Sequence, residues 1–212
     1  MGNTLSGNSE PAKNQLRIKI RTQRKTLSTA QTKTEFSQKI ITEFLQNSKV
    51  KTAKKIATFI PTQHEPNISV LHQQLIKNGC ALYAPKIKAQ DLLWGDYFGN
   101  LNELELNGSI LEPKTTRQEN IDFDLILVPA LAIDIFGNRL GQGGGYFDRV
   151  LKQSQAFKVA VIFDTEFLTE KIPTQAHDES VDAVLTPNKF QLIKDRKSTR
   201  LNSSHRCISY AV

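Results

Sequence analysis

The sequence predicts an α/β fold, a three-layer α/β/α sandwich with a largely parallel central sheet. Short apolar runs typical of buried strands alternate along the chain with segments whose apolar residues recur at helical spacing. Strands that alternate with helices in this way pair in parallel, and the helices cover both faces of the sheet. With 212 residues, 39% of them hydrophobic and 23% charged, the chain has the composition of a globular protein.

The first two predicted helices lie near the N-terminus. Residues 12–25 form a short basic helix in which Leu16 and Ile20 share one face. A second helix covers about 29–46, with Ser28 as the expected N-cap. Its apolar residues form one stripe, as in a helix that packs on a sheet: Phe36, Ile40, Ile41, Phe44 and Leu45.

The remaining elements are bounded by prolines and glycines. We expect a strand at 56–60 that ends at Pro61, and a strand at 80–84 that Pro85 stops. Between them lies a helix that Gly79 closes. The later elements are a short strand near 92–98, a turn at 107–108, strands at 124–128, 158–163 and 181–185, and a helix at 146–152. Ligands of such sheets bind beyond the carboxyl ends of the strands, so the loops after Ile60, Val128 and Phe163 are the expected site.

These elements form one domain with two irregular ends. We expect residues 1–11 to be a flexible leader and residues 12–196 to be the domain. Residues 197–212 follow the last strand without a pattern that connects them to it, so we interpret them as a non-native tail.

Composition and charge exclude several classes of protein. The longest apolar run, 125–133, has nine residues and contains a proline, whereas a membrane span needs about 20 apolar residues. Cys80 and Cys207 lack the spacing of a disulfide framework or a zinc site, which favours a reducing cytoplasm. The net charge of +7 belongs to the two ends, because residues 26–196 hold 19 bases and 20 acids. We therefore expect a cytoplasmic monomer without a nucleic-acid or membrane partner.

A cluster of glycines is the strongest functional signal. Four glycines occupy the five positions 141–145, after a buried strand and directly before a helix. Their backbone amides and the helix N-terminus favour a phosphate, and Arg139 and Arg149 flank the loop with positive charge. Asp148 is placed to hold Mg²⁺ on the same phosphates. The loop fits neither the Walker A pattern nor the dinucleotide fingerprint, and it can also be explained as a tight turn.

The basic helix is a second candidate. Lys13, Arg17, Arg21 and Arg24 recur at helical spacing and share one face. Such a stripe is stabilised when something anionic neutralises it, a triphosphate or a nucleic-acid backbone, although a solvated cationic face is the common alternative.

Three acidic positions complete the candidates. Glu65 follows the strand at 56–60, where a carboxylate can bind an amine or a guanidine-like group. Glu112 precedes a proline, and a plain turn is the alternative to a functional role. The pair of His177 and Asp178 is a candidate for a metal or general-base role, with ordinary surface residues as the alternative.

The run 124–148 closely resembles the signature of the 5-formyltetrahydrofolate cyclo-ligases, also called methenyltetrahydrofolate synthetases. The resemblance spans about 12–190. Shorter matches occur in the same order along the chain: Lys13, Leu16-Arg17, Arg21 and Arg24; Ile60 and Glu65; 83–85; Gly108 and 112–113; 177–178; and 182–186.

This resemblance implies the three-layer fold and an ATP-dependent closure of 5-formyltetrahydrofolate to 5,10-methenyltetrahydrofolate, with ADP and phosphate as the other products. It implies folate contacts for Ile60, Glu65 and Tyr146, a Mg²⁺ ligand in Asp148, and catalytic roles for Arg139 and Asp148. It implies ATP contacts for eleven residues: Lys13, Arg17, Arg139, Leu140, Gly141, Gln142, Gly143, Gly144, Gly145, Tyr146 and Phe147.

Two further residues stay open at this point. Trp94 is expected either to line the same pocket or to belong to the core, and Asp134 is a candidate second ligand for metal or water. The alternative function is a non-catalytic nucleotide- or RNA-binding relative of the same fold. A sugar-phosphate isomerase or an acyl-CoA transferase of similar architecture is a third hypothesis, which would not need the basic helix.

Overall fold

A seven-stranded sheet organises the chain, which the computed structural model describes over residues 9–27, 30–89, 91–117 and 121–193. The strand order is β12-β11-β9-β6-β1-β2-β3. All neighbours from β11 to β2 are parallel, and β3 and β12 add an antiparallel edge on each side. The predicted α/β class with a largely parallel sheet is thus confirmed. The strands are β1 Lys55–Ala57, β2 Ala81–Lys88, β3 Asp91–Tyr97, β6 Leu125–Pro129, β9 Phe157–Val161, β11 Ala183–Thr186 and β12 Lys189–Leu192.

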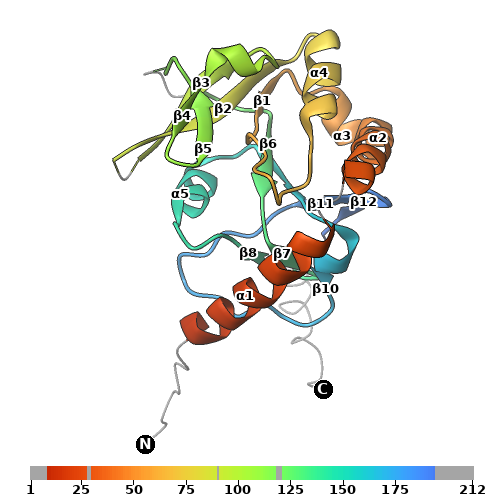
Figure 1. Cartoon of the computed structure of the whole chain (residues 1–212), viewed down its shortest axis with the longest axis vertical. Helices are drawn as coiled ribbons and strands as arrows, with labels where there is room; N and C mark the ends of the chain where they lie inside the picture. The colour runs from red at the N-terminus through yellow and green to blue at the C-terminus, as the bar shows by residue number, and fades with distance from the viewer. Residues whose placement is uncertain (1–8, 28–29, 90, 118–120, 194–212) are drawn as a thin grey trace, which may run out of the picture.

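Helices cover both faces of this sheet (Figure 1). On β6, Leu125 and Leu127 point to the face under α2 (Ala30–Gln46) and α4 (Ser69–Lys77). Ile126 and Val128 point to the opposite face, under α5 (Tyr146–Gln153). All four side chains are fully buried, as expected for a strand in the middle of a three-layer fold. The short helix α3 (Ser48–Lys51) follows α2.

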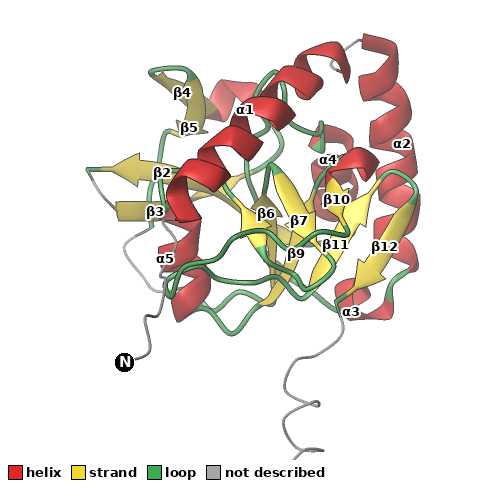
Figure 2. Cartoon of the chain, turned by 90° about the horizontal axis from the view of Figure 1, so that it is seen from below, coloured by secondary structure: helices red, strands yellow, loops and turns green. Residues whose placement is uncertain are grey.

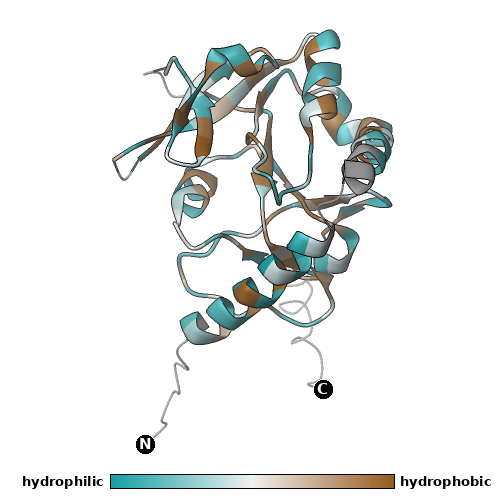
Figure 3. Ribbon diagram, viewed as in Figure 1, coloured by the Kyte–Doolittle hydropathy of each residue, from teal (hydrophilic) through white to brown (hydrophobic). Residues whose placement is uncertain are grey.

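The first helix lies outside these layers. Helix α1 (Ser9–Leu27) packs on a small sheet of β10 (Phe167–Leu168), β7 (Ala132–Asp134) and β8 (Arg139–Leu140), as the two views show (Figures 1 and 2). Its surface is mostly hydrophilic (Figure 3). The helix begins inside the predicted leader, and residues 1–8, the Ser28 cap and the tail lie outside the described residues.

The predicted end of one strand at Pro85 was wrong. Strand β2 continues to Lys88, and Pro85 lies opposite Trp94 of β3. The pairing with β1 ends at Tyr83, so Pro85 has a neighbouring strand on one side only. A proline is tolerated there because no strand on the other side requires its missing N–H.

A hairpin and two short 3-10 turns complete the fold. The hairpin pairs β4 (Leu104–Asn107) with β5 (Ile110–Pro113), and the turns are Leu101–Glu103 and Asp164–Glu166. No helix among the described ranges is long and apolar enough to cross a membrane.

The strand order also locates a crevice. From the central β1 the chain first moves outward to β2, and β6 later returns to the other side of β1. The loops that leave the carboxyl ends of β1 and β6 therefore diverge, which is where open α/β sheets bind ligands.

Candidate functional site

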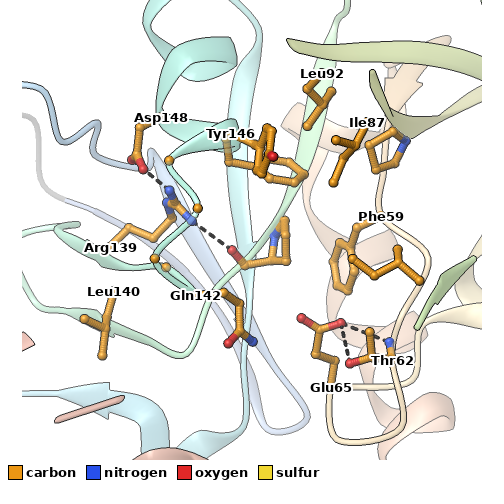
Figure 4. Close-up of a pocket in the computed structure, with 18 of the residues that line it drawn as sticks. Phe59, Thr62, Glu65, Ile87, Leu92, Arg139, Leu140, Gln142, Tyr146 and Asp148 are labelled. Carbon is orange, nitrogen blue, oxygen red and sulfur yellow. Dashed lines mark hydrogen bonds and ion pairs between the residues drawn. The ribbon is translucent and has the colours of Figure 1, made fainter. Parts of the chain in front are cut away.

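A cavity of about 780 Å³ lies at this crevice. It brings together the fourteen residues to which the resemblance assigns nucleotide, folate, metal or catalytic roles, and Figure 4 labels several of them. They come from three parts of the chain: α1, the loop after β1, and the segment from β8 to the start of α5. The residues are Lys13, Arg17, Ile60, Glu65, Arg139, Leu140, Gly141, Gln142, Gly143, Gly144, Gly145, Tyr146, Phe147 and Asp148.

The glycine loop forms one wall of the cavity. Gly145 is the N-cap of α5 with a φ of 66°, in the left-handed region that disfavours other residues. Gly141 has no such backbone requirement, but a Cβ there would lie 2.8 Å from a terminal nitrogen of Arg139. Gly143 also has a positive φ, of 108°. The loop thus needs glycine at two positions for its backbone and at Gly141 for the arginine beside it.

Arg139 is held rigidly beside this loop. It is 8% exposed, and its guanidinium donates to Asp148 Oδ1 at 2.7 Å and to the carbonyl of Pro129 at 3.2 Å (Figure 4). Its Nε is buried and has no hydrogen-bond partner among the described residues. A buried donor without an acceptor is costly. An anion bound against the loop is therefore a fitting partner for this nitrogen.

Two of the four cations of the basic helix reach the cavity. Lys13 Nζ lies 2.5 Å from Asp178 Oδ2. Arg17 donates from Nε to the carbonyl of Gly141 at 3.0 Å and pairs with Glu10 at 2.6 Å. Both cations are nearly buried, and each lies next to the glycine loop or to a segment facing it.

The other two cations have different roles. Arg21 is exposed and donates to the backbone and side chain of Gln142. Arg24 is buried away from the cavity and pairs with Glu166. The expectation that one anionic ligand neutralises the whole stripe is therefore wrong, since a protein carboxylate neutralises Arg24.

The Lys13 contact also explains the electrostatics of Asp178. Burial raises the pKa of the Asp178 carboxyl, but hydrogen bonds from Lys13 and from the backbone of Gln175 outweigh burial, and the pKa is lowered overall. Asp178 is thus a charged partner of Lys13. The neighbouring His177 is exposed, with its Nε2 3.9 Å from Asp178, so it lacks the setting of a general base.

The opposite wall of the cavity is apolar. Phe59, Ile87 and Leu92 lie across from the loop, and Tyr146 lies between the two walls (Figure 4). The Arg149 guanidinium lies 5.0 Å from the centre of the Tyr146 ring. This wall can accept a flat aromatic ligand.

Glu65 is the carboxylate at the base of the apolar wall. It is 9% exposed, and one oxygen accepts hydrogen bonds from the backbone and hydroxyl of Thr62 at 2.9 and 3.0 Å. These bonds fix the carboxylate in the cavity (Figure 4). The sequence located Glu65, whereas Ile87 and Leu92 were missed because their position depends on the pairing of β2 with β3.

Three candidates of the sequence have structural roles instead. Asp134 is fully buried, and its two oxygens accept four hydrogen bonds. Three come from the backbone N–H groups of residues 136, 138 and 172, and one comes from the Asn138 side chain. Because both oxygens are already occupied, Asp134 is not a metal ligand. Glu112 lies in β5 and holds the Ile87 amide and the Asn107 side chain. Trp94 is partly buried, packs between Phe123 and Phe147 against the core, and is not among the residues that line the cavity.

The described residues offer no group of three metal-ligating side chains of the His, Cys, Asp or Glu type. A metal ion at Asp148 would thus need most of its ligands from water and from a bound phosphate. This is the usual environment of Mg²⁺ at nucleotide sites.

Comparison with known proteins agrees with this geometry. The family model described as the 5-formyltetrahydrofolate cyclo-ligase family matches residues 9–187. The chain belongs to this family. The match includes all the cavity residues described above.

Relatives in this family are similar over most of their length. The chain is 32% identical to the 5-formyltetrahydrofolate cyclo-ligase of Escherichia coli K12, over 79% of this chain and 96% of that protein. It is 34% identical to the enzyme of the same name from Mycolicibacterium smegmatis, over 64% of this chain and 75% of that protein. The solved structure of Aquifex aeolicus 5,10-methenyltetrahydrofolate synthetase has a TM-score of 0.75 and 27% identity, covering 93% of this chain and 96% of that one.

Proposed function

We propose that this cyclo-ligase family member catalyses the ATP-dependent cyclisation of 5-formyltetrahydrofolate to 5,10-methenyltetrahydrofolate. The observation that carries the proposal is the composition of one cavity: a glycine loop with three cations faces an apolar wall with a fixed carboxylate. The first half suits a nucleotide and the second half suits a pterin ring. Both substrates of a phosphoryl transfer can therefore meet in the same space.

The reaction requires activation of a poor electrophile. The formyl oxygen attacks the γ-phosphorus of ATP, the bond to the bridging oxygen breaks, and ADP leaves. The resulting iminium phosphate is attacked at carbon by N10 of the folate, which loses its proton while the C–O bond to phosphate breaks. The products are the methenyl bridge, ADP and phosphate. Transfer of this kind depends on positioning and on charge neutralisation more than on covalent help.

The nucleotide contacts are assigned to the polar wall. Arg139, Lys13 and Arg17 neutralise phosphates, and the amides of residues 141–145 wrap around them. Leu140, Gln142 and Phe147 complete this wall. The buried Nε of Arg139, without a partner in the described structure, supports an anion at this place.

Asp148 is assigned as the protein ligand of Mg²⁺. When bound there, the ion supplies charge neutralisation at the phosphates. Asp148 then no longer needs to pair with Arg139, and the guanidinium becomes available to the γ-phosphate. Arg139 and Asp148 are thus the two residues that act on the reacting group.

The folate contacts are assigned to Ile60, Glu65 and Tyr146. A carboxylate accepts hydrogen bonds from the amino and ring N–H groups of a pterin, and Thr62 holds Glu65 in place for this role. Tyr146 provides a ring against which the substrate packs, adjacent to the glycine loop.

We also propose that the protein is a cytoplasmic monomer without a nucleic-acid or membrane partner. The neutral charge balance of residues 26–196 argues against a nucleic-acid partner.

The test is a spectrophotometric assay of purified protein with 5-formyltetrahydrofolate, Mg²⁺ and ATP. We expect the near-ultraviolet band of the methenyl product, which requires ATP and is lost in the Arg139→Met variant. Folded protein that binds ADP but gives no band would contradict the proposal and favour the non-catalytic nucleotide-binding relative.

A further inference from the structure

Two of the arginines on the basic stripe of α1, Arg17 and Arg24, have separate roles. Arg17 lines the cavity, whereas Arg24 is 1% exposed and lies outside it. Arg24 donates to Glu166 from Nε at 2.6 Å and from a terminal nitrogen at 2.8 Å, a bidentate pair. Glu166 is 2% exposed and also accepts the backbone N–H of Phe163 at 3.0 Å. The pair therefore ties α1 to the segment that follows β9.

The same guanidinium reaches the end of β6. Arg24 donates to the carbonyl of Ala130 at 2.5 Å, and Arg139 donates to the carbonyl of the preceding residue, Pro129, at 3.2 Å. Two guanidinium groups thus hold consecutive carbonyls of one short segment. Arg139 is the proposed catalytic arginine, and Arg24 belongs to α1. The positions of Arg139 and of α1 therefore both depend on the same segment at the end of β6.

Apolar packing alone leaves α1 weakly held. Its contacts with the small sheet involve Ile20 and the partly buried Leu16, while Ile18 on the same helix is 65% exposed. Polar contacts therefore fix the orientation of the helix: those of Lys13, Arg17, Arg21 and Arg24. The first three go to residues that line the cavity, and only the Arg24 contact lies outside it.

Stability does not account for a pair of this kind. Burial raises the pKa of the Glu166 carboxyl, and the hydrogen bonds from Arg24 only oppose this effect. A buried ion pair usually contributes little net stability, because the cost of removing both charges from water offsets their attraction. The pair instead defines how α1 is placed against the segment that follows β9.

We propose that Arg24 and Glu166 are positioning residues for nucleotide binding, which orient α1 so that Lys13 and Arg17 meet the phosphates at the glycine loop. Arg17 lies seven residues, or two helical turns, from Arg24, a distance of roughly 10 Å along the axis. A small change of angle at the pair displaces the Arg17 guanidinium. Misplacement of a binding group by about 1 Å can cost about a hundredfold.

This proposal rests on the proposed function, and the test separates the two. The activity of the wild-type protein decides the proposed function. The affinity for inorganic tripolyphosphate, measured by calorimetry without folate, decides the positioning role, because it requires no turnover. We expect Arg24→Lys and Glu166→Gln each to weaken tripolyphosphate binding about tenfold or more.

Steady-state kinetics give a second readout. We expect the KM for ATP to rise about tenfold, with the KM for folate unchanged and kcat at saturating ATP within about threefold. In the Arg17→Ala background, Arg24→Lys adds much less to the KM, since the contact that it positions is already lost. A Glu166→Gln or Arg24→Lys protein with unchanged tripolyphosphate affinity, or effects that multiply fully with Arg17→Ala, would overturn the proposal.

Two further variants keep the test decisive. Asp124→Asn is the matched control, because Asp124 accepts two backbone hydrogen bonds at the opposite end of the sheet. It lowers the melting temperature without changing the KM for ATP. If the single variants fail to fold, the Arg24→Met/Glu166→Met double variant replaces the pair by apolar side chains of similar volume. That protein folds and shows the same loss of tripolyphosphate affinity; normal affinity would contradict the positioning role.

Discussion

Arg139 and Asp148 form an ion pair of 2.7 Å across the glycine loop, so the residue assigned to phosphate and the residue assigned to metal neutralise each other in the free protein. They are nine positions apart, and all four glycines of the loop lie between them. The ion pair therefore connects the two ends of the glycine loop. In the proposed function, nucleotide and Mg²⁺ would compete with this pair on binding.

The first prediction follows from that competition. Asp148→Asn removes the negative charge that neutralises Arg139. Without Mg²⁺, the variant therefore binds tripolyphosphate several-fold more tightly than the wild type. With Mg²⁺, its ligase activity falls about a hundredfold, because the proposed metal ligand is lost. Calorimetry in the presence of a chelator measures the first effect. Glu170→Gln, an exposed carboxylate, is the control. Weaker binding by Asp148→Asn without Mg²⁺ would disagree with the assignment of Arg139.

The second prediction concerns Glu65. Glu65→Gln keeps the size of the side chain but removes the charge that accepts pterin N–H groups, so the KM for folate rises about tenfold and the KM for ATP stays unchanged. Glu112→Gln is the matched comparison, because Glu112 lines the same cavity but is committed to Ile87 and Asn107. It lowers stability and leaves the folate KM alone. Equal effects of both variants on the folate KM would exclude a specific role for Glu65.

The third prediction separates two uses of glycine. Gly141→Ala places a Cβ 2.8 Å from Arg139, so it displaces the guanidinium and lowers activity about tenfold or more. Gly79→Ala, at a φ of 77° with nothing within 4 Å of its Cβ, costs about 1 kcal/mol of stability through backbone strain alone. Kinetics and thermal unfolding of both proteins decide this. An active Gly141→Ala protein would show that Arg139 is not needed in its observed place.

The fourth prediction is the pH dependence caused by His72. His72 is fully buried, its Nε2 lies 2.7 Å from the Thr58 hydroxyl, and burial lowers its pKa to about 3. Unfolded His72 takes up a proton below pH 6.5, while the folded residue stays neutral. Stability therefore falls as pH drops from 6.5 towards 3, by about 1.4 kcal/mol per pH unit from this residue alone.

His72→Gln tests that dependence. Glutamine can keep the hydrogen bond to Thr58 and has no proton to gain, so the variant loses less stability than the wild type between pH 6 and pH 4. Urea unfolding at several pH values measures the difference. Parallel pH profiles for both proteins would contradict a neutral buried His72.

The sequence allowed the main sheet and the cavity to be predicted for physical reasons that are local. A short apolar run with a proline at its end, such as 125–128, favours a buried strand. Four glycines directly before a helix favour a phosphate loop, with a tight turn as the alternative. Ligand sites at the carboxyl ends of strands follow from the topology. These rules do not require knowledge of distant contacts.

The features that were missed depend on contacts between distant residues. Strands β8 and β10 have two residues each, too short for any periodicity. Arg17 and Arg24 carry the same signal in the sequence, and only the carboxylate at position 166 gives Arg24 its different role. A deletion of residues 1–25 would leave the buried Glu166 without its arginine, so point substitutions are the sharper test.

In the proposed reaction, the γ-phosphate of ATP is transferred to the formyl oxygen of the folate within the cavity. The most direct measurement uses 5-formyltetrahydrofolate labelled with oxygen-18 in the formyl group, followed by mass spectrometry of the phosphate released. We expect one labelled oxygen in the phosphate released by every turnover. Unlabelled phosphate, with the heavy oxygen recovered in water, would contradict the proposed reaction.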